Sequence, residues 1–148
     1  MPHIGWGAHD VGLVAWHLSI GASIMFVMFV RLLYRLHVKT PLPAELPLWE
    51  RAFANIVHWM LYLLVFAMAI LGWSAASAHG WRVRLFGLFV LPTLARKGAH
   101  WGFAAGDIHD VLVYVLLGFI VVHVFGAFFH YIIKQDRVLN RMLRLRKS

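Results

Sequence analysis

The chain of 148 residues contains no cysteine, few acids and no charged residue within three long stretches. The absence of cysteine excludes disulfides, iron–sulfur clusters and every metal site built from thiolates. Only six Asp and Glu residues occur, and none lies in the uncharged stretches, so a proton pump or cation-coupled transporter would lack its usual carrier. The chain also has no HExxH motif, nucleophile elbow or Gly-rich phosphate loop, and we predict no catalytic side chain.

The three uncharged stretches are long enough to cross a bilayer. They comprise residues 11–30, a run within 52–81, and residues 111–133, in a chain that is 61% hydrophobic with a mean hydropathy of +0.73. A soluble domain of this size could not bury so much apolar surface, and no segment alternates like a strand. The sequence therefore predicts an all-α membrane protein, a single domain over 1–148 with transmembrane helices at about 11–36, 53–75 and 109–133.

The net charge of +8 comes from cations at the ends of the apolar segments, which points to membrane topology and away from nucleic acid. One side of the membrane receives the first connection and the C-terminal tail, with ten cations: Arg31, Arg35, Lys39, Arg51, Lys134, Arg137, Arg141, Arg144, Arg146 and Lys147. The other side receives four: Arg82, Arg84, Arg96 and Lys97. The positive-inside rule then predicts a cytoplasmic C-terminus and an outer N-terminus. The outer connection is rich in Gly and Trp, and its WRVRLFGLFVLP portion is expected to lie on the membrane surface.

Histidine is unusually frequent, and three of the ten histidines lie in one predicted helix. His109 and His123 are 14 positions apart, so on a helix they lie within about 40° of one face and about 21 Å apart along the axis. His130 is seven positions further on, near the same face. Imidazoles at membrane depth are costly and are kept mainly where they bind something. The spacing suits two stacked haems, each taking a second imidazole from a facing helix.

The outer pair is predicted from depth. His17 lies near the outer end of the first span and His109 near the outer end of the third, as an axial pair requires. Gly21, one turn after His17, removes a side chain where a porphyrin would lie against the helix. The alternative is that both histidines are interfacial and hydrated by headgroups.

The other candidates are less constrained. His123 lies deep in the bilayer and should bind iron, because an unpartnered ring there would cost a few kcal/mol; a backbone hydrogen bond is the alternative. His58 is a candidate for ligating iron, holding a haem propionate or bonding a quinone, or for an ordinary hydrogen bond within its helix. His130 is a candidate for propionate or quinone contact. The remaining histidines are expected in water or at the interfaces: His3, His9, His37, His79 and His100.

The outer cations suggest a particular donor. Arg82, Arg84, Arg96 and Lys97 have no acid between them and could concentrate a small redox-active anion, of which superoxide is the obvious example. Anchoring to lipid phosphates is the alternative interpretation.

Several motifs resemble the bacterial cytochrome b561 family, which is akin to the cytochrome b subunit of nickel-iron hydrogenases. They occur in the family's order from about Val11 to the C-terminus: WHLSIG at 16–21, VRLLYRL at 30–36, PLPAELPLWER at 41–51, HWMLYLL at 58–64, FGLFVLP at 86–92, IHDVLVYVLLGFIVVHVFGAFFHY at 108–131 and KQDRVLNRML at 134–143.

The resemblance implies a four-helix bundle in the bacterial inner membrane that binds two b-type haems. It also implies electron transfer between a periplasmic or membrane donor and the quinone pool (ubiquinone, for example), with superoxide oxidation in some members. By motif, His17 and His109 would ligate the outer haem and His123 the inner one. The family's other inner ligand lies on a preceding helix that these residues do not contain. We therefore expect a start upstream of Met1, the alternatives being loss of the inner haem or replacement of that ligand by His58, His130 or another subunit.

Two functions remain after this comparison. The first is a b-type cytochrome acting as an electron-transfer oxidoreductase, with superoxide:quinone oxidoreduction as its most specific form. The second is a haem-bearing anchor subunit that relays electrons for a dehydrogenase or hydrogenase. Membrane lipid, a quinone, and superoxide or a redox protein are the implied partners, and homodimer formation is left open.

Overall fold

Three long helices make up the structure, a computed structural model that describes residues 8–38 and 47–132. They are α1 (Ala8–His37), α2 (Leu48–His79) and α3 (His100–Ile132). Each is long and apolar enough to cross a membrane. The prediction of an all-α membrane protein with three transmembrane helices is thus confirmed.

The helices extend beyond the predicted spans. α2 begins at Leu48 and ends at His79, and α3 begins at His100, nine residues before the predicted start. The predicted last residue, 133, lies outside the described residues. The sequence located the apolar core of each helix, but the helical hydrogen bonds continue into the interfacial turns because a broken backbone would leave polar groups unpaired near lipid.

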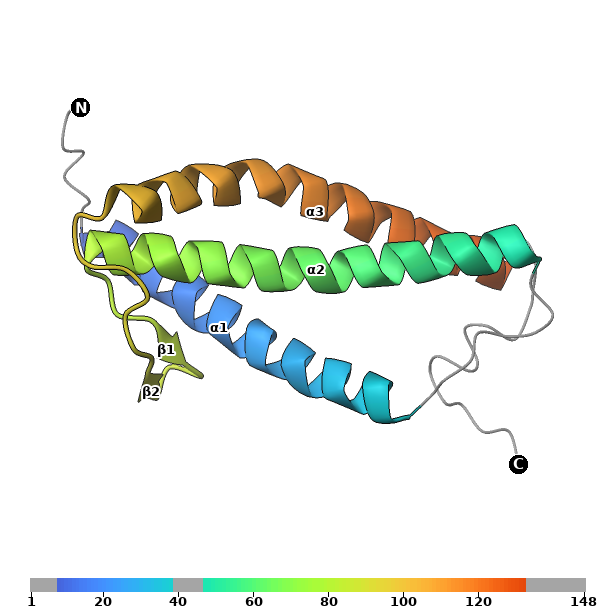
Figure 1. The fold of residues 1–148 in the computed structure, drawn as a ribbon, viewed down its shortest axis with the longest axis horizontal. Coiled ribbons are helices and arrows are strands. Elements are labelled where there is room, and N and C mark those ends of the chain that lie inside the picture. The colour runs from blue at the N-terminus through green and yellow to red at the C-terminus, as the bar shows by residue number, and fades with distance from the viewer. Residues whose placement is uncertain (1–7, 39–46, 133–148) are drawn as a thin grey trace.

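α2 is the central helix (Figure 1). It runs antiparallel to its two neighbours, with α3 packed along its length and α1 packed on it near one end and diverging from it toward the other. No Cα atoms of α1 and α3 approach within 8 Å among the described residues. α1 and α3 are therefore joined through α2 and through side chains that lie in the space between them.

Small side chains let α2 and α3 approach closely at the end where α3 begins. A Cβ atom at Gly102 would lie 2.6 Å from the Cβ of Ala78 and 3.1 Å from the carbonyl oxygen of Ser74. Ser74, Ala78 and Ala105 are buried at this end of the bundle. Since lipid tails supply no hydrophobic drive between helices, such close backbone packing is a main source of helix association.

A short hairpin follows α2. β1 (Arg84–Leu85) pairs antiparallel with β2 (Phe89–Val90), in the register Arg84↔Val90 and Leu85↔Phe89. Three residues separate the strands; two of them have positive φ, Phe86 (53°) and Gly87 (73°), and the N–H of Leu88 donates to the Leu85 carbonyl at 3.0 Å. The sequence missed this hairpin because two-residue strands show no alternation.

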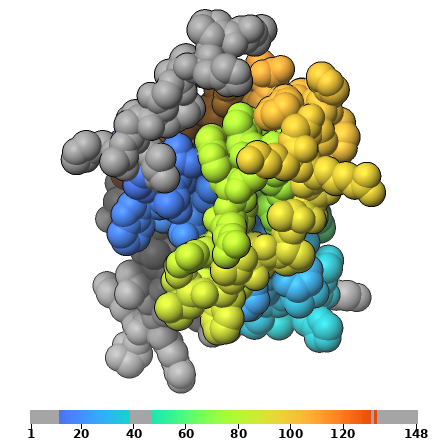
Figure 2. Space-filling view, turned by 90° about the vertical axis from the view of Figure 1, so that its left-hand side faces the viewer, coloured from blue at the N-terminus to red at the C-terminus, as the bar shows by residue number. Residues whose placement is uncertain are grey.

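The hairpin is attached to α1. The N–H of Phe86 donates to Ser23 Oγ at 3.1 Å, and the Phe86 ring meets the Phe26 ring with 5.6 Å between centres. Figure 2 shows the loop and hairpin beside α1 at the end of the bundle where α2 ends. The connection between α2 and α3 is therefore packed against α1, and it also lies at the surface of the bundle.

We predict opposite effects for one substitution at two glycines of α3. Gly102→Ala should destabilise the protein by about 1–3 kcal/mol, because the added methyl overlaps Ala78 and the backbone of α2. Gly118→Ala should leave stability unchanged or raise it by up to about 1 kcal/mol, since nothing lies within 4 Å of the added atom and alanine favours the helix. Reversible unfolding in detergent measures both; equal effects would contradict the packing described.

Candidate functional site

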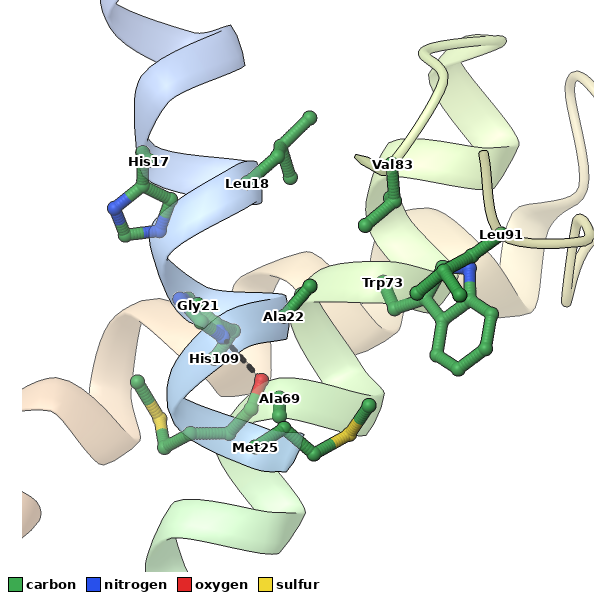
Figure 3. A pocket seen from close by; sticks show the side chains of 12 residues that line it. His17, Leu18, Gly21, Ala22, Met25, Ala69, Trp73, Val83, Leu91 and His109 are labelled. Carbon is green, nitrogen blue, oxygen red and sulfur yellow. Dashed lines mark hydrogen bonds between the residues drawn. The ribbon is translucent and has the colours of Figure 1, made fainter. Parts of the chain in front are cut away.

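Two histidine rings bridge the space between α1 and α3. His17 of α1 and His109 of α3 have ring centres 6.1 Å apart, with their planes 86° to each other. They line a pocket together with residues of α1, of α2 and of the loop (Figure 3). Its other lining residues are Leu18, Gly21, Ala22, Met25, Met68, Ala69, Gly72, Trp73, Val83 and Leu91. The site is apolar apart from the two imidazoles.

The separation of these rings suits a shared metal ion. An imidazole nitrogen binds a metal at about 2.0–2.1 Å, so two rings facing each other across one ion have centres about 6 Å apart. The 6.1 Å between the ring centres of His17 and His109 matches this value. A Cβ at Gly21 would meet nothing within 4 Å, which leaves open space beside His17.

α2 holds the His109 ring in place. Its Nδ1 lies 2.9 Å from the carbonyl oxygen of Met68, drawn as the dashed line in Figure 3. A carbonyl oxygen can only accept, so Nδ1 carries the proton and donates, and Nε2 keeps the lone pair that a metal requires. Gly72 makes room for the ring: a Cβ there would lie 3.0 Å from Cε1 and 3.1 Å from Nδ1 of His109.

A second pair of rings lies further along the bundle. His58 of α2 and His123 of α3 have ring centres 5.1 Å apart and planes at 66°. His58 Nδ1 is buried and has no hydrogen-bond partner among the described residues. This separation is shorter than the outer one, and the two rings come from helices that pack directly on each other.

His130 lies at the end of the bundle where α2 begins. Its Nε2 is 3.9 Å from Glu50 Oε2, and both side chains are largely shielded from solvent. Nearby, the Arg35 guanidinium lies over the rings of Trp59 and Tyr62, at 5.3 and 5.6 Å from their centres, and donates to Asn55 Oδ1. This end therefore combines an acid, an imidazole and a cation.

The histidine pairs occur at distinct levels along the helices. His109 of the first pair and His123 of the second, both on α3, are separated by about 21 Å of helix rise. No group of three or more His, Cys, Asp or Glu side chains gathers in the described part of the chain. Pairs are what a haem iron needs, because the porphyrin supplies the other four ligands.

Comparison with known proteins identifies the family. A model of the prokaryotic cytochrome b561 family matches residues 1–145. The chain belongs to the prokaryotic cytochrome b561 family. Its members are membrane proteins that bind haem b and carry electrons, and the three apolar helices fit a multi-pass protein of the inner membrane.

Three relatives illustrate the match. Cytochrome b561 homolog 2 of Escherichia coli (strain K12) is 39% identical over 131 residues, covering 86% of this chain and 68% of that protein. Cytochrome b561 homolog 1 of the same organism is 29% identical, covering 88% and 74%. The probable superoxide oxidase CybB of Yersinia pestis is 28% identical, covering 86% and 72%.

The outer site fits the haem that the family implies. The ring centres of His17 and His109 are 6.1 Å apart, close to the separation expected for two imidazoles that bind one metal ion, and His109 is already in the tautomer that frees Nε2. Gly21 leaves the α1 side open, and the rest of the lining is apolar, as a porphyrin face requires. At the inner site His123 is present with His58 beside it, but their separation is about 1 Å shorter than two ligands of one iron need.

The five histidines predicted from the sequence lie in two pairs, with the remaining ring, that of His130, 3.9 Å from the Glu50 carboxylate. The structure brings His17 to His109, as expected, and His58 to His123, one of several alternatives. The sequence did not indicate the Met68 carbonyl, the role of Gly72 or the Glu50 partner of His130. Backbone carbonyls carry no sequence signal, but Glu50 was identifiable as the acid in the first turn of α2.

We predict that Gly72→Ala weakens the outer site specifically. The new methyl would displace the His109 ring and break its hydrogen bond to the Met68 carbonyl. We therefore expect the affinity for haem to fall about 10–100-fold, as is typical when a group that orients a metal ligand is lost. Titration of the apoprotein with haem measures this. Gly12→Ala, where nothing lies within 4 Å, is the matched control. Equal haem affinity in both variants would contradict the assignment.

Proposed function

We propose that this protein transfers electrons across the inner membrane from a periplasmic donor to the quinone pool. The observation that carries the proposal is the His17–His109 pair in an apolar pocket. The two ring centres are 6.1 Å apart, the separation expected for two imidazoles that bind one metal ion. His123, about 21 Å further along α3, marks a second level toward the opposite end. Two redox centres so placed would divide the low-dielectric core into shorter steps.

In this proposal the imidazoles of His17 and His109 would hold the outer haem, and His123 would help to hold the inner one. Bound haem would supply one-electron redox chemistry. The chain's own residues set position and environment. Met68 fixes the His109 tautomer, Gly72 admits the ring, and the apolar lining keeps water away.

The outer end is proposed to receive superoxide. Arg82 and Arg84 are exposed on the segment whose Val83 and Leu91 line the pocket, so cationic charge lies beside the pocket wall. Such a field would draw in a small anion. The relative from Yersinia pestis is named a probable superoxide oxidase, which supports this choice of donor. Each superoxide anion would give up one electron and leave as dioxygen.

The opposite end is proposed to serve a quinone such as ubiquinone. A quinone takes up two electrons and two protons to become a quinol, so two superoxide anions supply one turnover. His130 and Glu50, 3.9 Å apart, provide an imidazole to bond a quinone oxygen and a carboxylate that can pass on a proton. The ten-to-four cation count supports a cytoplasmic location for this end, from which protons would be drawn.

We predict that His17→Ala and His109→Ala each remove the same b-type haem, because each deletes one of two ligands to one iron. Oxidised-minus-reduced spectra with a haem assay on the purified protein measure the loss, expected to be nearly complete for that haem. His100→Ala, an exposed histidine at the start of α3, should change neither spectrum nor haem content. A full spectrum in His17→Ala would refute the ligand assignment.

We also predict that Arg82→Gln combined with Arg84→Gln slows haem reduction by superoxide and weakens its dependence on ionic strength, since fewer cations attract the anion. A loss of about 10-fold or more in rate at low salt is expected, shrinking as salt is added. Arg144→Gln, assigned by the charge count to the opposite side, serves as the control. An unchanged rate and salt response in the double variant would favour lipid anchoring.

A further inference from the structure

We propose that His58 is a positioning residue for His123, as the hydrogen-bond partner of the His123 ring nitrogen that faces away from the iron. This inference rests on the proposed function, in which His123 is a ligand of the inner haem. It assigns His58 a role different from axial ligation, propionate binding and quinone binding.

The distance between the rings distinguishes the two arrangements. Two imidazoles joined by an N–H···N bond of about 2.9 Å have ring centres about 5 Å apart. Two imidazoles that bind one metal ion have centres about 6 Å apart. His58 and His123 are at 5.1 Å, whereas His17 and His109 are at 6.1 Å. The inner pair therefore matches contact between rings, and the outer pair matches ligation.

The His58 ring also has an acceptor to offer. Its Nδ1 is buried and lacks a hydrogen-bond partner among the described residues. A buried nitrogen in this state costs about 1–3 kcal/mol and calls for an explanation. Rotation of the neighbouring rings would let a His58 nitrogen accept the proton of His123, which satisfies both groups and leaves the other His123 nitrogen for iron.

α2 would then orient the α3 ligand at both levels, by different means. At the outer level His109 reaches the Met68 carbonyl because the residue one turn later, Gly72, has no side chain. At the inner level the α2 group beside the α3 histidine is the side chain of His58, whose ring centre lies 5.1 Å from that of His123. An imidazole nitrogen there could take the part that a backbone carbonyl takes at the outer level.

The consequence is electronic as well as geometric. An acceptor on the far nitrogen makes the ligating imidazole more basic, which stabilises the oxidised iron and lowers its midpoint potential. His58 would thereby lower the midpoint potential of the inner haem without binding its iron.

The test is potentiometric titration of the purified holoprotein and of His58→Ala and His58→Gln, with haem content measured in parallel. We expect His58→Ala to keep both haems and to raise the midpoint potential of one, leaving the other unchanged. His58→Gln, whose amide oxygen can accept, should restore part of the shift. His37→Ala, an exposed histidine at the end of α1, should alter neither potential.

Other results overturn the proposal. Loss of one haem in both His58 variants, with the His17-dependent haem retained, would make His58 a ligand. Two haems with unshifted potentials in His58→Ala would leave His58 without influence on His123. A wild-type protein whose only haem is lost in His17→Ala would have no iron at His123. A protein that binds no haem at all would instead refute the proposed function.

Discussion

A ring nitrogen at membrane depth must find a partner, because lipid offers no hydrogen bonds and an unpaired polar group there costs a few kcal/mol. This requirement organises the molecule. His109 meets it with the Met68 carbonyl on one nitrogen and keeps the other available to a metal. The His17 ring lies next to the His109 ring, where the backbones of α1 and α3 do not approach each other. The bundle is thus arranged around imidazole rings whose nitrogens each require a partner.

α2 provides the rigid reference for this arrangement. It packs closely on α3, where Gly102 and Ala78 bring the two backbones together, and it supplies Met68 and Gly72 to the outer site. α1 contributes His17 and diverges from α2 toward its other end, and the hairpin is attached to α1 through Ser23. A scaffold of this kind fixes the His109 ring and leaves space on the α1 side, beside Gly21, for a large planar group. That division suits a protein whose cofactor carries the chemistry and whose helices set depth and orientation.

Much of this could be predicted. The apolar runs and the cations at their ends predicted three transmembrane helices. In lipid a backbone segment must pair its own N–H and C=O groups, so a long apolar run can cross the membrane only as a helix or as part of a closed barrel. Helical spacing gave the relative depths of His109, His123 and His130, and the level of His17 followed from its place in the first span. The hairpin at Arg84–Val90 was missed because its strands are too short to show a period. Glu50 was visible as an acid in a first helical turn, but its partner on another helix was not.

By itself, the amino-acid sequence determined the solvent, the helices and the depth of each imidazole, since these follow from periodicities and transfer energies that act along one segment. The tertiary structure alone decided which rings face each other and at what separation. Those depend on how each helix is rotated about its axis and on how closely two backbones approach. Such quantities are set by contacts between distant residues, as Gly72 shows where it admits His109 to the Met68 carbonyl. A separation of 6.1 Å in one pair and 5.1 Å in the other is therefore information that only the packed bundle contains.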